Sequence, residues 1–187
     1  ITDLGALDHI LFLLVLAAIY RLGDWRESLW VVTAFTVGHS ITLALAVTGA
    51  LRMPTDLIEF LIPVTIVATG IENVIVRERK NAPWRGRYRP VFACVFGLVH
   101  GAGFANYLNS LFVDRIALPL LGFNIGIEVG QIVVLALITG ALFGVDRLIG
   151  LIRLPLTAPA PHRLRAVAVS LTVAMVATRW AVERSPW

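Results

Sequence analysis

The sequence of 187 residues contains a single cysteine, Cys94, which lies inside an apolar run. One cysteine excludes a disulfide within the chain, and it excludes a metal site built from several thiolates. We therefore interpret Cys94 as a small residue that fills space in a packed interior. The zinc-protease pattern HExxH is also absent, so no single local motif defines a metal site.

Charged residues are scarce as well: they make up 15% of the chain, whereas hydrophobic residues make up 58%. Soluble domains contain about 45–50% apolar residues. The excess lies in runs of about 18 residues or more, the length that a helix needs to cross a bilayer. We therefore predict an all-α integral membrane protein, with residues 1–187 forming one transmembrane domain of about six helices. The predicted spans cover about 4–21, 28–51, 55–77, 89–111, 116–142 and 164–181.

The formal net charge of +4 comes from basic residues that lie between the apolar runs. This placement indicates a lipid bilayer as the partner, rather than nucleic acid, and it predicts the orientation of the chain. The loop at 77–89 is strongly basic, and residues 145–163 form a basic, proline-containing linker that includes a solvated His162. By the positive-inside rule both face the cytoplasm, so both termini face outward. We expect a bacterial-type inner (cytoplasmic) membrane and an extracytoplasmic part before Ile1, with the chain as the membrane module of a longer protein.

Ionisable residues nevertheless occur inside the predicted spans. A charged side chain at the membrane centre costs about 2.5–3.5 kcal/mol on insertion scales, so such residues usually face the bundle interior and have a role. Three of the four histidines are in this position. The ionisable residues within the spans are Asp8, His9, His39, Glu72, His100 and Glu128.

Helical periodicity, at about 100° per residue, groups further polar side chains with these six. Side chains on the same arc as a candidate ligand are expected to support it or to line the path of an ion. They are Thr36 and Ser40 beside His39, Asn73 beside Glu72, and Asn124 and Gln131 beside Glu128.

Two sets of glycines are expected to let helices pack closely against each other. Gly97 and Gly101 bracket His100 in the fourth span. Gly122, Gly126 and Gly130 form a stripe on the fifth span, nearly opposite its polar face.

Three imidazoles with several carboxylates, and without thiolates, form a donor set that suits zinc, nickel, cobalt or iron. The donors come from different helices, and composition alone does not choose among the metals. We expect a divalent transition metal ion, of the nickel, cobalt or zinc type, to be held by Asp8, His9, His39, His100 and Glu128.

Five stretches of the sequence resemble the HupE/UreJ family of membrane proteins. They are "LDHILFLLVL", "VVTAFTVGHSITLALA", "IEN", "FGLVHGAGFA" and "GFNIGIEVGQ". The resemblance is closest to the branch with the motifs FGLxHGxGFA and FNxGxExGQ, and it covers about residues 5 to 132. It implies a small helical bundle linked to nickel or cobalt uptake. Position by position, it points to Asp8, His9, Phe35, His39, His100, Glu128 and Gln131.

Three functions are compatible with these residues. In a metal permease, Asp8 and His9 capture the ion from outside; His39, His100 and Glu128 form a mid-membrane site, and Glu72 passes the ion inward. In a zinc-dependent intramembrane hydrolase, the polar groups converge on one ion with an open water position. A non-catalytic subunit of a membrane complex would bind no metal and pair its polar groups internally. Six spans give few helices to enclose a pore, which favours a homo-oligomer or a larger complex.

Overall fold

Residues 4–76, 88–109, 117–151 and 160–187 are described by the structure, a computed structural model. Every regular element in these ranges is a helix, which confirms the predicted all-α architecture. The elements are α1 (Leu4–Ala17), the short 3-10 helix η1 (Leu22–Asp24), α2 (Trp25–Val47), α3 (Thr55–Ile75), α4 (Arg89–Asn109), α5 (Ala117–Leu151) and α6 (Pro161–Glu183).

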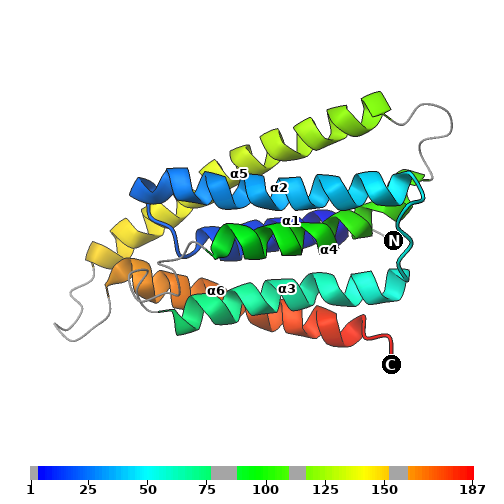
Figure 1. The fold of residues 1–187 in the computed structure, drawn as a ribbon. Helices are drawn as coiled ribbons and strands as arrows, with labels where there is room; N and C mark the ends of the chain where they lie inside the picture. Colours follow the sequence, from blue (N-terminus) through cyan, green and yellow to red (C-terminus); the bar gives the residue numbers. More distant parts are fainter. Residues whose placement is uncertain (1–3, 77–87, 110–116, 152–159) are drawn as a thin grey trace.

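Consecutive helices run in opposite directions, so both ends of the chain lie at one end of the bundle (Figure 1). We call this the terminal end. The opposite end holds the last turns of α1, α3 and α5 and the first turns of α2, α4 and α6, and we call it the basic end after its arginines. The described ones are Arg21, Arg26, Arg89, Arg147, Arg163 and Arg165. Both termini thus lie at the same end of the bundle, and the side of the membrane that this end faces stays a prediction.

The fifth helix is longer than predicted. α5 continues past residue 142 to Leu151, so the prediction of a linker is wrong for residues 145–151; residues 152–159 lie outside the described part. The charge of Asp146 is compensated within the bundle, because its Oδ1 lies 3.1 Å from Nε of Arg165 in α6. His162 was also predicted in this linker, but it lies half-buried in the first turn of α6, which begins at Pro161.

Apolar side chains fill the interior and also cover the outside. The fully buried ones include Phe12, Val15, Phe35 and Ile66. On the outer surface Ile75 is 71% exposed and Leu137 is 69% exposed. Four helices, α2, α3, α5 and α6, are long and apolar enough to cross a membrane, and the described parts of α1 and α4 contain shorter apolar helices. Lipid chains are as apolar as leucine, so this outer surface suits a bilayer.

Helices α2 and α4 approach each other through glycines. A Cβ atom added to Gly97 would lie 2.0 Å from the Phe35 carbonyl oxygen, and one added to Gly101 would lie 2.2 Å from that of His39. On the opposite helix, a Cβ atom at Gly38 would lie 2.0 Å from the Cys94 carbonyl oxygen. The backbones are therefore in direct contact, as small residues allow in membranes. The predicted packing role of Gly97 and Gly101 agrees with this geometry.

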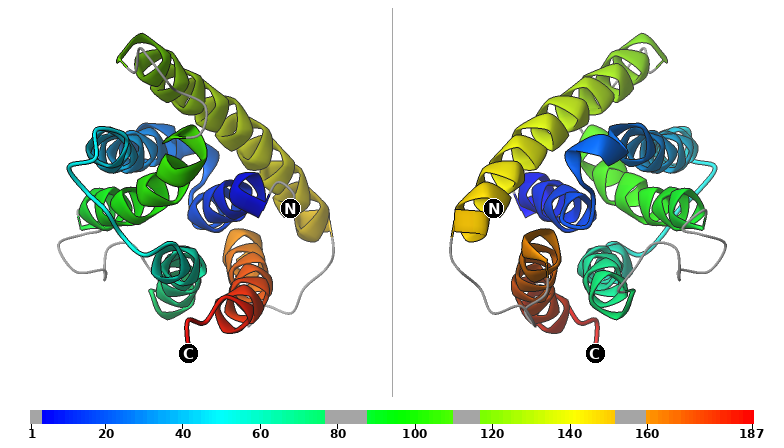
Figure 2. Two further views of the ribbon diagram at one scale, coloured as in Figure 1. Left: turned by 90° about the vertical axis from the view of Figure 1, so that its right-hand side faces the viewer. Right: turned by 90° about the vertical axis from the view of Figure 1, so that its left-hand side faces the viewer.

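Helix α5 differs from the others in lying obliquely across the outside of the bundle (Figure 2). Cβ atoms added to Gly122, Gly126 or Gly130 would meet no atom of the described residues within 4 Å. That this stripe lets another helix approach closely stays a prediction, because no described helix of this chain covers it. The reason is that the opposite, polar face of α5 is the one that contacts α2.

Candidate metal centre

The three predicted intramembrane histidines come together from three different helices. The ring centroid of His9 in α1 lies 5.5 Å from that of His39 in α2 and 5.1 Å from that of His100 in α4. His39 and His100 are completely buried, and His9 is half-buried. We call these three residues the histidine cluster. The glycine contact between α2 and α4 brings His39 and His100 to the same level.

Phenylalanine rings enclose the histidine cluster. Phe35 stacks on Phe12, with ring centroids 4.6 Å apart, and its centroid lies 5.1 Å from that of His100. The ring centroid of Phe104 lies 5.1 Å from that of His9 and 5.7 Å from that of His39. Phe35 was expected here from the family motifs, whereas Phe104 was not singled out. Its position four residues after His100, on the same face of α4, was the signal available in the sequence.

A hydroxyl group orients the ring of His100. Thr65 Oγ1 lies 2.7 Å from the Ile62 carbonyl oxygen and 3.1 Å from Nε2 of His100. A hydroxyl carries one hydrogen. We assign that hydrogen to the Ile62 carbonyl, so that Nε2 of His100 donates to the Thr65 oxygen. Nδ1 of His100 then carries the lone pair, and it has no hydrogen-bond partner in the described part of the chain.

His39 is the other imidazole with open positions. Neither of its ring nitrogens has a hydrogen-bond partner among the described residues. A buried polar group left without a partner costs about 1–3 kcal/mol. A metal ion accepts a lone pair from a neutral imidazole, so the donor chemistry of the histidine cluster fits a transition metal.

The rings are not yet arranged around a common point. They meet edge to face, at interplanar angles of 77° and 89° with His9. Among the described residues, no group of three or more His, Cys, Asp or Glu side chains has a geometry that could hold a metal ion. Zinc–imidazole bonds are about 2.0–2.1 Å long, so binding requires at least one ring to rotate.

The two predicted carboxylate ligands have other partners. Asp8 Oδ2 lies 3.0 Å from Nη1 of Arg184. Glu128 Oε1 lies 3.4 Å from the Thr33 hydroxyl. Neither carboxylate joins the histidine cluster in a metal-binding arrangement within the described residues. For Asp8 the reason is local, because neighbouring residues of a helix point about 100° apart, and His9 takes the direction of the cluster.

The polar face of α5 contacts the polar arc of α2. Thr36 Oγ1 donates to Oε1 of Gln131 over 2.8 Å, and both side chains are buried. Ser40 and Asn124 are half-buried, one on each helix. This polar seam lies on the same arc of α2 as His39 and leads toward the histidine cluster.

Glu72 and Asn73 belong to a network at the basic end. Glu72 accepts hydrogen bonds from Tyr88 and Arg89. Asn73 Nδ2 donates to the Val15 carbonyl over 2.6 Å, and Nη2 of Arg89 donates to Asn73 Oδ1 over 3.1 Å. Burial and the hydrogen bond to the Glu72 carboxylate raise the pKa of Tyr88 to about 12. Glu72 thus accepts hydrogen bonds from two donors, and the Asn73 side chain connects α3 with α1 and with Arg89 at the start of α4.

The sequence did not reveal the arginines that donate hydrogen bonds to these carboxylates and carbonyl groups. Arg89 was counted with the loop, yet it is buried and reaches back to α3. Arg163 of α6 donates to the Asn73 carbonyl over 2.7 Å and to the Val76 carbonyl over 3.1 Å. Arg184 pairs with Asp8, and nothing in the sequence connects these two positions. Each arginine stands at a helix end near a buried acceptor, which was the only signal available.

Of the three comparisons with known proteins, only the comparison with protein-family models gives a match. The family model described as HupE / UreJ protein matches residues 4–184. Comparison with curated proteins and with solved structures gives no match. The matched range contains all six long helices and every residue of the histidine cluster.

Proposed function

Because the chain belongs to the HupE/UreJ family, we propose that it binds a divalent transition metal ion at the histidine cluster and carries it across the membrane. Proteins of this family are generally nickel- or cobalt-transporter-like membrane proteins. The observation that carries the proposal is the convergence of His9, His39 and His100 from three helices, with ring nitrogens of His39 and His100 that have no hydrogen-bond partner among the described residues.

The donor set favours transition metals over magnesium and calcium. Imidazole nitrogens suit nickel, cobalt and zinc, whereas magnesium and calcium prefer oxygen ligands. Nδ1 of His100 is the nitrogen that we assign to the metal, because Nε2 donates to Thr65. Metal-bound histidines commonly use their second nitrogen in this way, which holds the ring in one tautomer.

A small cavity supports a path from the histidine cluster toward Glu72. It has a volume of about 100 Å³, and Phe12, Thr69 and Glu72 are among the residues that line it. Phe12 also contacts His100, with ring centroids 5.4 Å apart. Thr65 and Glu72 are seven residues apart on α3, which corresponds to about 10 Å along the helix. The cavity therefore extends from the aromatic wall of the cluster toward the basic end.

An ion pair closes each end of this path. Arg184 holds Asp8 at the terminal end, and Arg89 holds Glu72 at the basic end. We propose that the structure is the closed state of the transporter, in which an entering ion displaces Arg184 from Asp8. An ion that leaves the protein at the basic end competes with Arg89 for the carboxylate of Glu72. By the positive-inside rule the basic end faces the cytoplasm, so transport runs inward from Asp8 to Glu72.

The separation of the carboxylates favours transport over hydrolysis. A hydrolase needs a carboxylate base within hydrogen-bond reach of a metal-bound water. Asp8, Glu72 and Glu128 instead have separate partners, Arg184, Arg89 and Thr33. Passage of an ion requires polar groups at separate positions along the path, and these three carboxylates are arranged in that way.

Metal uptake into vesicles tests the proposed function. The purified full chain is placed in liposomes that contain a metal-sensitive dye, and Ni²⁺ or Co²⁺ is added outside. We expect uptake by the wild type and its loss in His39→Ala and His100→Ala. His162→Ala is the matched control, because it removes the same side chain outside the cluster. Uptake that survives both cluster substitutions would overturn the proposal.

A further inference from the structure

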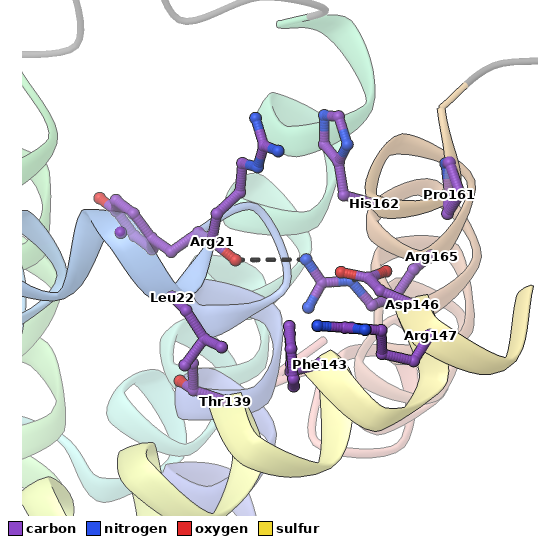
Figure 3. A pocket seen from close by; sticks show the side chains of 11 residues that line it. Arg21, Leu22, Thr139, Phe143, Asp146, Arg147, Pro161, His162 and Arg165 are labelled. Atoms are coloured by element: carbon purple, nitrogen blue, oxygen red, sulfur yellow. Dashed lines mark hydrogen bonds and ion pairs between the residues drawn. The ribbon is translucent and has the colours of Figure 1, made fainter. Parts of the chain in front are cut away.

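A second, larger cavity lies at the basic end, outside the proposed metal path. It has a volume of about 350 Å³ and is lined by η1 and the two residues before it, the last turns of α5 and the first turn of α6. Figure 3 shows the ionisable side chains that surround it. They are Arg21, Asp146, Arg147, His162 and Arg165. Three guanidinium groups thus share one cavity with a single carboxylate.

That carboxylate is already engaged with the most deeply buried arginine. Asp146 Oδ1 lies 3.1 Å from Nε of Arg165, whose Nη2 also donates to the Tyr20 carbonyl over 3.2 Å. Arg165 is only 4% exposed. Its guanidinium is therefore held in place at the base of the cavity. The single negative charge of Asp146 compensates only one of the three arginine charges that line the cavity.

Because Arg21 and Arg147 also line it, the cavity has an excess of positive charge. Within the described part of the chain, neither guanidinium forms an ion pair with a carboxylate. Both residues are exposed at the cavity mouth. The Arg147 guanidinium carbon lies over the Phe143 ring, 5.0 Å from its centroid, which holds this charge against the cavity wall. The start of α6 at Pro161 adds the positive end of a helix dipole to the same lining.

The surroundings of the cavity are apolar. Leu22 lines it and is 48% exposed, and nearby on α5 and α6 Leu148 is 65% exposed and Leu164 is 42% exposed. A ligand in this position would have its anionic part among arginines and any hydrocarbon part against leucines. This is the arrangement of a phospholipid at a membrane surface, where basic pockets between helices bind anionic head groups.

We propose that this cavity binds a phosphate-bearing anion, and that its occupant is the head group of an anionic phospholipid. Arg21 and Arg147 supply charge-assisted hydrogen bonds to the phosphate oxygens, as guanidinium groups do. Arg165, fixed by Asp146, forms the wall against which the head group rests. The proposal does not depend on metal transport, because none of these residues contacts the histidine cluster.

Lipid binding by the purified full chain tests the proposal. Native mass spectrometry and thermal unfolding are measured with phosphatidylglycerol, with phosphatidylcholine and with inorganic phosphate. The test variant combines Arg21→Gln with Arg147→Gln. Its control combines Arg52→Gln with Arg179→Gln, which removes two exposed arginines from the terminal end. A third variant, Arg21→Lys with Arg147→Lys, keeps both charges.

We expect the wild type to prefer phosphatidylglycerol to phosphatidylcholine. One surface arginine contributes about fivefold to the binding of an anionic lipid, so the double glutamine variant should bind about 25-fold more weakly. The terminal-end control should bind like the wild type, and the lysine variant should keep most of the affinity. Stabilisation by inorganic phosphate that depends on both arginines would support the phosphate site and assign it to free phosphate. Unchanged binding of phosphatidylglycerol by the glutamine variant would overturn the proposal.

Discussion

Thr65 Oγ1 lies 3.1 Å from Nε2 of His100, and its hydrogen bond to the Ile62 carbonyl leaves it an acceptor toward that nitrogen. A single hydroxyl thereby selects the tautomer of a fully buried imidazole. It leaves the lone pair on Nδ1, the nitrogen without a hydrogen-bond partner in the described part of the chain. The orientation of the candidate ligand is thus set by a residue that does not itself reach the metal.

Replacing Thr65 with valine, which has the same shape, removes this hydrogen bond. Groups that orient metal-bound histidines contribute about 10–100-fold to metal affinity, so we expect Thr65→Val to weaken Ni²⁺ or Co²⁺ binding by that amount. Titration calorimetry of the purified chain measures the change. Thr69→Val is the matched control: Thr69 is equally buried on α3, and its hydroxyl donates to the Thr65 carbonyl. Equal losses in both variants would contradict the role of Thr65.

Substituting Gly101 with alanine should separate α2 from α4. The added Cβ atom would lie 2.2 Å from the His39 carbonyl oxygen, which is backbone and cannot rotate away. Overpacking of this kind costs about 1–3 kcal/mol, and it also displaces His39 from His100. We expect a lower Tm in detergent together with weaker metal binding. Gly126→Ala, with open space around its Cβ position in the described residues, should change neither.

Glu72 and Arg89 form a pair whose structural and transport roles can be separated. Glu72→Gln leaves the buried Arg89 guanidinium without its carboxylate, and breaking a buried pair in this way costs up to about 3–5 kcal/mol. The double variant Glu72→Gln with Arg89→Met removes both charges and should recover much of the lost stability. Uptake should stay low in the double variant, since the carboxylate at the exit is still missing. Recovery of uptake along with stability would show that Glu72 is only structural.

The sequence predicts what lies within one helix much better than what lies between helices. Apolar runs located all six long helices, and periodicity placed Gln131 on the face of α5 that meets Thr36. Periodicity does not determine how two helices are rotated relative to each other. Asp8 therefore could not be matched with Arg184, which lies 176 residues away.

The same limit explains why the end of the fifth helix was placed too early. Asp146 is a charged residue near the end of the predicted fifth span. Its partner Arg165 lies in the next helix, and nothing in the sequence pairs the two residues. The glycines of α5 suit close helix packing, but no described helix of this chain covers them. The histidine cluster was predictable as a set of residues, because three imidazoles in apolar spans require a shared interior. Its aromatic wall and the hydroxyl of Thr65 required the structure.

Tyr88 offers a test of the network around Glu72 through pH. Its pKa is raised to about 12, above the ordinary tyrosine value of about 10. The phenol therefore stabilises the fold fully below pH 10, and this contribution is lost as the pH rises through 12. We expect the wild type to be more stable than Tyr88→Phe by a constant margin below about pH 10, and the margin to shrink between pH 10 and 12. Thermal unfolding of both proteins across this range provides the measurement. A margin that is constant up to pH 12 would contradict the raised pKa, and with it the burial of the phenol beside the Glu72 carboxylate.

The most direct test of the central claim is the metal content of the protein itself. Untagged full chain is incubated with Ni²⁺, Co²⁺ or Zn²⁺, freed of unbound metal and analysed for bound metal per chain. We predict one ion per wild-type chain, one per His162→Ala chain and none per His39→Ala chain. Stoichiometric metal in the His39→Ala protein, or none in the wild type, would contradict a metal site at the histidine cluster.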